Sequence, residues 1–202
     1  PSALPTEHGS FVPPDDTRLP LAELARRLAG PSPHPLDCTA EHSAGPTYPN
    51  GCHIAEVEID PDTGVTEIVR YTAVDDFGTV VSPQLVEGQV HGGLMQGAGQ
   101  VFGEKVVYDD AGQLLTGSFT DYVMPRIGWA FPVQWASHPV PTQTNALGAK
   151  GVGESGCTGS LSSLANAMID ALRPLGITAM DTPFTPARVW QAGQERTLAT
   201  RP

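Results

Sequence analysis

The stretch CHIAEVEIDPDTGVTEIVRYTAV, residues 52–74, carries the clearest secondary-structure signal in this chain of 202 residues. In its first half, Ala55, Val57 and Ile59 alternate with residues that belong to the opposite face. A period of two is typical of a half-buried strand. Residues 61–64, PDTG, place turn-forming residues directly after it, and a second β-rich run follows. The stretch therefore predicts a β-hairpin.

A glycine-rich loop lies downstream at residues 148–160, GAKGVGESGCTGS. It has little side-chain bulk, so its backbone can approach a ligand closely. Glu154 is the only acid in this loop, which makes it our best candidate for catalysis. The apolar residues that follow have helical spacing and predict a helix ending before Pro174: Leu161, Leu164, Ala165, Met168 and Leu172.

Two other interpretations of this loop were weighed. Gly151, Gly153 and Gly156 satisfy the pattern GxGxxG of a dinucleotide-binding turn. No buried strand precedes them, and only 46 residues follow Gly156, which is too short for a doubly wound sheet. The nucleotide interpretation is therefore disfavoured. The second interpretation, a solvated acid near a helix N-terminus, stays open on spacing alone.

A second glycine-rich stretch, residues 87–103, has apolar residues at helical spacing. Glycine costs a helix about 1 kcal/mol relative to alanine, so the five glycines from Gly88 to Gly99 require a reason. One explanation is close packing against another element. The other is a bulky ligand lying along a face without side chains, with Gln89, Gln96 and Gln100 as hydrogen-bonding groups.

The remaining elements alternate irregularly, which favours an α+β domain of mixed sheets, hairpins and packed helices. We expect residues 1–50 to form an extended arm and connector, and residues 51–202 to form the domain. The further predicted elements are a helix at 19–28, a hairpin of 104–109 with 113–119, a strand at 132–138 and a closing helix at 186–191.

Composition excludes several classes of function. A net charge of −11 without a run of basic residues argues against a nucleic-acid partner. No apolar run is long enough to cross a membrane and no signal peptide is visible, so we expect a cytoplasmic location. The three cysteines and scattered histidines lack metal-ligand spacing, so no protein-ligated metal site is expected, and Cys157 is disfavoured as a nucleophile.

Four ordered segments carry a family resemblance. They are PNGCHIAEVEIDPDTGVTEIVRYTAVDDFGTVVSP, EGQVHGGLMQGAGQVFGE, GSFTDYVMPR and LGAKGVGESG. They resemble the C-terminal part of the molybdopterin-binding large subunit of the xanthine dehydrogenase, aldehyde oxidase and aerobic carbon monoxide dehydrogenase family. The resemblance covers about residues 48–193, and it is strongest to the carbon monoxide dehydrogenase-like and bacterial hydroxylase branch.

The resemblance implies roles for particular residues. Glu154 matches the active-site glutamate, a general base in an enclosed glycine pocket that helps to hydroxylate or oxidise a small substrate with oxygen derived from water. Ser82 stands where relatives often carry asparagine. The positions expected to contact the cofactor are Gln96 and Gly97 at its pterin end, Lys150, Gly151, Val152 and Gly153 in the loop, and Phe77, Gly78, Thr79 and Ser82 near its dinucleotide end. For Lys150, an ordinary surface lysine is the alternative.

The resemblance also implies a set of cofactors and partners. Molybdenum would be held by the dithiolene sulfurs of molybdopterin, in its cytosine dinucleotide form, and iron–sulfur clusters and FAD would sit on partner subunits. The N-terminal portion of the large subunit would complete the site, so this chain is expected to be an excised domain or a split subunit, inactive alone and prone to oligomerise. A noncatalytic cofactor-binding or assembly module is the alternative. The residues do not select a substrate.

Overall fold

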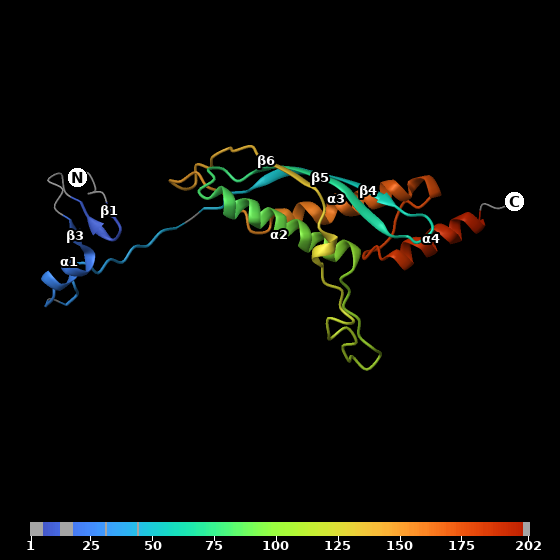
Figure 1. Cartoon of the computed structure of the whole chain (residues 1–202), viewed down its shortest axis with the longest axis horizontal. Helices are drawn as coiled ribbons and strands as arrows, with labels where there is room; N and C mark the ends of the chain where they lie inside the picture. The colour runs from blue at the N-terminus through green and yellow to red at the C-terminus, as the bar shows by residue number, and fades with distance from the viewer. Residues whose placement is uncertain (1–5, 13–17, 31, 44, 200–202) are drawn as a thin grey trace. The chain divides into compact units, whose positions relative to one another are not determined.

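The computed structural model describes residues 6–12, 18–30, 32–43 and 45–199, and the chain divides into two compact units, Pro1–Ser43 and Ala44–Pro202. The first unit has a small antiparallel sheet and one short helix (Figure 1): β1 (Thr6–Glu7), β2 (Ser10–Phe11), β3 (Leu19–Pro20) and α1 (Leu21–Arg27). The helix predicted at 19–28 is thus confirmed in its centre, with strand β3 taking its first two residues. The division into an arm and connector of residues 1–50 and a domain of residues 51–202 stays a prediction.

The second unit is built on a three-stranded sheet in the order β4 (Asn50–Ile59), β5 (Thr66–Asp76) and β6 (Val133–Ser137). Strands β4 and β5 form the predicted antiparallel hairpin, and β6 pairs with β5 in parallel. The turn between β4 and β5 closes with Gly64 at a φ of 73°, a left-handed conformation that glycine adopts without strain. A methyl group there would also overlap the carbonyl of Pro186.

Strand β5 contains a β-bulge. Glu56 pairs with Arg70, whereas the next residue, Val57, pairs with Ile68, so Val69 is left without a partner on β4. Val69 is exposed, while Ile68 and Tyr71 on either side of the bulge both contribute to the core. The extra residue allows β5 to keep its inward side chains facing the helices along its whole length.

Two long helices pack under this sheet (Figure 1), α2 (Pro83–Phe102) and α3 (Ser155–Leu172). They cross at very small residues. A methyl group on Gly93 would lie 2.9 Å from Cα of Gly156, and one on Gly97 would overlap the hydroxyl of Ser160. Close packing, the first of the two explanations for the second glycine-rich stretch, therefore accounts for Gly93 and Gly97.

The helices and the sheet share one hydrophobic core. The predicted inward face of α3 is confirmed, because Leu164, Met168 and Leu172 are all buried. The hairpin predicted at 104–119 is reduced to one isolated bridge, Tyr108–Leu114, and no strand forms there. The closing helix is longer than predicted: α4 spans Pro186–Ala199. Two short 3₁₀ turns, Ile127–Trp129 and Arg173–Leu175, complete the unit. The α+β prediction is confirmed.

Candidate functional site

The glycine-rich loop before α3 is held by backbone hydrogen bonds to the segment that leaves β5. The amide of Lys150 donates to the carbonyl of Phe77 at 2.8 Å, and the amide of Thr79 donates to the carbonyl of Gly148 at 2.9 Å. Between them, Gly78 has a φ of 60°, and a methyl group there would overlap the Gly148 carbonyl. The structure thus brings Phe77, Gly78 and Thr79 together with the loop. The ring of Phe77, however, is buried in the core and stacks on Trp135.

An ion pair reinforces this junction. Nζ of Lys150 lies 2.5 Å from Oδ2 of Asp76, and the lysine side chain is only 9% exposed. Burial raises the pKa of Asp76, but the hydrogen bonds from Lys150 and from the amides of Val140 and Gly78 outweigh it and lower the pKa to about 2. The alternative of an ordinary surface lysine is therefore wrong. Lys150 fastens the loop to the end of β5.

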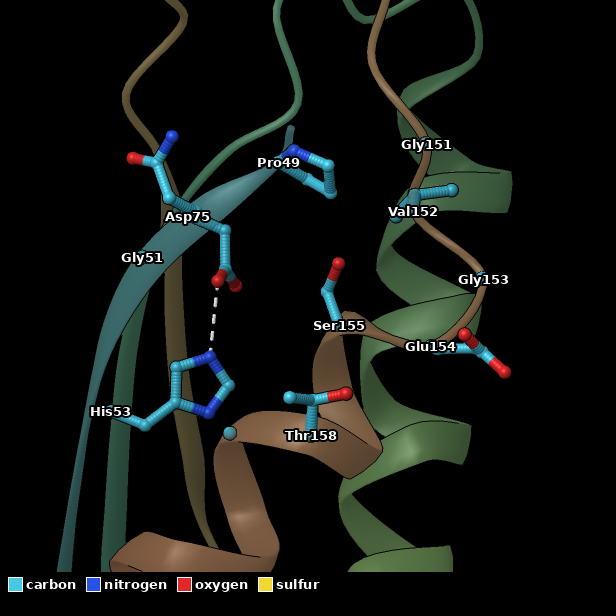
Figure 2. A pocket seen from close by; sticks show the side chains of 12 residues that line it. Pro49, Gly51, His53, Asp75, Gly151, Val152, Gly153, Glu154, Ser155 and Thr158 are labelled. Carbon is cyan, nitrogen blue, oxygen red and sulfur yellow. Dashed lines mark hydrogen bonds and ion pairs between the residues drawn. The ribbon is translucent and has the colours of Figure 1, made fainter. Parts of the chain in front are cut away.

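A cavity of about 420 Å³ opens between the loop, the start of α3 and the edge of β4 and β5 (Figure 2). Its volume is in the range that small-molecule sites occupy. It is lined by Pro49, Asn50, Gly51, His53, Asp75, Gly151, Val152, Gly153, Glu154, Ser155, Thr158 and Gly159. Glu154, Gly151, Val152 and Gly153, which were all predicted as site residues, therefore converge on one cavity.

Two carboxylates line the cavity, and their surroundings differ. Asp75 is buried, with Oδ1 bonded to His53 and Oδ2 bonded to Trp135. Glu154 is exposed, precedes the first residue of α3 and makes no side-chain capping hydrogen bond. Figure 2 shows its side chain pointing away from the His53–Asp75 pair. The enclosed pocket predicted for Glu154 is not formed by the described residues.

The loop glycines leave their backbone accessible. A methyl group added to Gly151 or Gly153 would meet nothing within 4 Å, so both positions face open space. The amide of Gly151 donates to Oγ1 of Thr47 at 3.3 Å. Val152, between them, packs against the core and anchors the loop. Such a loop can present its backbone to a large polar group.

The residues predicted at the second glycine-rich stretch occupy different faces of α2. Gly97 is buried against α3, whereas Gln96 is exposed. Gly88 and Gly92 lie on the exposed side with no atom within 4 Å of an added methyl group. Ser82 precedes α2 as its N-cap residue without a side-chain capping bond. Neither Gln96 nor Ser82 lines the cavity beside Glu154.

The surroundings of Cys157, the cysteine within the glycine-rich segment, disfavour its thiolate form. Burial raises the pKa of the Cys157 thiol, and the nearby carboxylates of Glu104 and Glu154 raise it further. In residues 6–12, 18–30, 32–43 and 45–199, no group of three or more His, Cys, Asp or Glu side chains could hold a metal ion. None of the helices in those ranges is both long and apolar enough to cross a membrane.

His53 and Asp75 are site residues that the sequence did not reveal. They lie 22 positions apart on neighbouring strands, and their side chains are 6% and 3% exposed. A lone histidine in a strand and an acid at the end of the next strand give no recognisable spacing. Only the register of β4 and β5 brings them to the same wall of the cavity.

Comparison with known proteins identifies the class of domain. Residues 1–129 match the family described as "Molybdopterin cofactor-binding domain". The chain belongs to this family and, through its relatives, to the xanthine dehydrogenase, aldehyde oxidase and carbon monoxide dehydrogenase family of molybdenum oxidoreductases. The predicted family is confirmed. The match includes residues before 48, which the sequence motifs had left outside the resemblance.

Three relatives illustrate the similarity. The chain is 39% identical to the carbon monoxide dehydrogenase large chain of Hydrogenophaga pseudoflava, over 76% of this chain and 19% of the relative. It is 34% identical to the nicotine 6-hydroxylase large subunit of Paenarthrobacter nicotinovorans, over 91% of this chain and 23% of the relative. The structure superimposes on quinoline 2-oxidoreductase from Pseudomonas putida 86 with a TM-score of 0.71 and 38% identity, over 73% of this chain and 19% of that chain.

The chain thus spans about a fifth of the length of the relatives that it matches. The names of these relatives refer to carbon monoxide, nicotine and quinoline, at similar levels of identity. Similarity alone therefore does not select a substrate.

Proposed function

We propose that this chain forms one part of the active site of a molybdenum hydroxylase and that Glu154 is its general base. The observation that supports this proposal most directly is the contrast between the two carboxylates of the cavity. Both oxygens of Asp75 already accept hydrogen bonds from buried donors, whereas Glu154 is exposed and has no capping bond. A general base must be reachable by the proton that it removes, and of the two carboxylates only Glu154 is exposed.

The loop and the first turn of α3 suit a polar cofactor. The glycine backbone at 151 and 153 faces open space, and the hydroxyl-bearing residues Ser155 and Thr158 line the same cavity. The N-terminus of an 18-residue helix adds a partial positive charge there. Bound molybdopterin with its molybdenum would supply the oxidation–reduction chemistry. We propose that the chain's part is to bind and orient the cofactor and to take up a proton at the Glu154 carboxylate.

The other predicted contacts divide into direct and supporting ones. Gln96 and the exposed glycines of α2 would bind the pterin end directly, and Thr79 and Ser82 would lie near the dinucleotide end, which we propose is cytosine dinucleotide. Phe77, Gly78 and Gly97 are packed against neighbouring elements and would support the binding surface through their backbone and shape. We propose that Lys150 acts in the same supporting way, through its ion pair with Asp76.

The proposal requires partners that accept electrons. Relatives named as a large chain or a large subunit imply an assembly of several subunits. We propose that an iron–sulfur subunit and an FAD subunit remove electrons, that the remaining portion of the large subunit encloses Glu154 and a small-molecule substrate, and that the assembly is cytoplasmic.

The test is Glu154→Gln in the assembled enzyme. This variant keeps the size of the side chain and removes its basicity, so we expect kcat to fall about 10²- to 10⁴-fold while molybdenum and pterin content stay unchanged. Asp170→Asn is the matched control, because Asp170 is an exposed acid at the far end of the same helix. That control should keep kcat within about twofold.

Full turnover in Glu154→Gln would refute the assignment of the base. Cofactor binding without any turnover in the wild-type assembly would favour the alternative, a noncatalytic cofactor-binding or assembly module.

A further inference from the structure

A chain of hydrogen-bonded side chains crosses the wall of the cavity beside Glu154. Trp135 on β6 bonds to Asp75 at 2.9 Å, Asp75 bonds to His53 at 3.0 Å, His53 bonds to the Tyr71 hydroxyl at 2.8 Å, and that hydroxyl bonds to Ser163 at 2.8 Å. These five side chains come from all three strands of the sheet and from α3. None of them belongs to the cofactor contacts or to the base proposed above.

The two hydrogen bonds to Asp75 have a fixed direction, because carboxylate oxygens accept. The Trp135 ring can only donate, so Oδ2 of Asp75 accepts from it. Burial raises the pKa of Tyr71 to about 12, with a smaller opposing effect from the Ser163 hydrogen bond and a further increase from the Asp75 charge. The Tyr71 hydroxyl therefore keeps its proton, and it is hydrogen-bonded to both Nδ1 of His53 and the hydroxyl of Ser163. Nε2 of His53 donates a hydrogen bond to Oδ1 of Asp75, because the carboxylate oxygen accepts.

These hydrogen bonds hold the ring of His53 against α3. A methyl group on Gly159 would overlap the ring of His53, so the ring lies directly on the helix backbone. One turn further along α3, the hydroxyl of Ser163 is hydrogen-bonded to the hydroxyl of Tyr71. The sheet therefore contacts two successive turns of α3, at Gly159 and at Ser163.

The neighbouring side of the same turns packs against α2. A methyl group on Gly156 would lie 3.1 Å from Cα of Gly93, and Ser160 fills the space beside Gly97. These contacts of α3 are made at Gly156, Gly159, Ser160 and Ser163, which have no long side chain that could take up a displacement. Glu154 immediately precedes this part of the helix.

We propose that His53, held by Asp75 and Tyr71, is the positioning residue for Glu154: it fixes the first turns of α3 against the sheet and so sets the place of the glutamate carboxylate. This inference rests on the proposed function, because it assigns the purpose of the network to the general base. It does not make His53 a catalytic residue, since both ring nitrogens are already bonded within the protein.

The test compares two serines on α3 in the assembled enzyme. Ser163→Ala removes the bond to Tyr71, whereas Ser162→Ala removes an exposed hydroxyl that bonds only to the Gly159 carbonyl of its own helix. Tyr71→Phe breaks the same contact from the sheet side and keeps the ring in the core. We expect Ser163→Ala and Tyr71→Phe to lower kcat about tenfold, with KM and cofactor content unchanged, and Ser162→Ala to behave as wild type.

Hydrogen–deuterium exchange supplies a readout that is independent of turnover. In Ser163→Ala and Tyr71→Phe, residues 151–158 should exchange at least about tenfold faster, while residues 164–172 of α3 keep their wild-type rates. Faster exchange along the whole helix, unchanged exchange at 151–158, or unchanged kcat would each overturn the positioning role. Failure of the general base is read from another variant, Glu154→Gln, so the two failures are distinguishable.

Discussion

Lys150 and Asp76 form an ion pair between positions 74 residues apart, and this pair joins the glycine-rich loop to the end of β5. We expect Lys150→Met to destabilise the second unit, because it leaves the buried Asp76 carboxylate without its cation. The pKa of Asp76 is depressed to about 2 in the folded state, so its stabilising contribution is complete above about pH 4 and disappears as the pH falls through about 2. That contribution amounts to at most about 2 kcal/mol.

Denaturant unfolding at pH values between 2 and 7 measures this effect. The wild type should lose stability between about pH 4 and pH 2, and Lys150→Met should be less stable at pH 7 and depend less on pH in that window. Equal pH dependence in both proteins would show that the ion pair does not contribute to stability.

The sequence identified the residues of the loop but not their surroundings. Glu154 could be singled out from its motif, because the glycines around it lack the side chains that would keep a ligand away from the backbone, and Glu154 does line the cavity. The burial of Lys150 and the bonding of His53 did not follow. Both depend on partners that only the folded sheet brings near, Asp76 for the lysine and Asp75 for the histidine.

The glycines of α2 differ in what surrounds them, and this difference is testable within one element. Gly97→Ala places a methyl group on the Ser160 hydroxyl, so we expect it to destabilise the protein by about 1–3 kcal/mol. Gly92→Ala meets open space and improves helix propensity, so it should stabilise by about 0.5–1 kcal/mol. Thermal or denaturant unfolding of both variants checks the opposite signs. Similar effects at both positions would contradict the helix crossing described above.

Elements with a strong local pattern were predicted well, and those that depend on distant partners were not. The hairpin of β4 and β5 has both alternation and a good turn, and it forms as predicted. The segment 104–119 has a turn at Asp109–Gly112 with hydrogen bonds of its own, but it pairs only at Tyr108 and Leu114. The parallel pairing of β6 with β5 could not be predicted, because 56 residues separate the end of one strand from the start of the other.

At the scale of the whole chain, large apolar side chains lie on the surface. Ile127 is 93% exposed and Phe119 is 79% exposed, and both belong to the long connection between α2 and β6. Single exposed apolar residues are common, but a group of them marks an interaction surface. We therefore expect the isolated chain to self-associate over the concentration range used for light scattering.

Light scattering of the isolated chain measures this association. Replacing Phe119 and Ile127 together by serine should shift the population toward monomer, whereas replacing the exposed polar residues Gln113 and Thr120 by alanine should leave it unchanged. A wild-type chain that is monomeric throughout this range would contradict the prediction.

The unpaired Val69 in β5 determines which residues reach the cavity. Side chains alternate between the two faces of a strand, so an extra residue exchanges the faces of everything beyond it unless a bulge absorbs it. Ile68 precedes the bulge and faces the core with or without it. Tyr71 and Asp75 follow the bulge, and in a regularly alternating strand they would lie on the same face as Val69, which is exposed. If the same residues alternated regularly without the bulge, both would turn to the outer face, and His53 would lose its two partners. A single β-bulge thus keeps Tyr71 and Asp75 on the inner face of β5, where both form hydrogen bonds to His53.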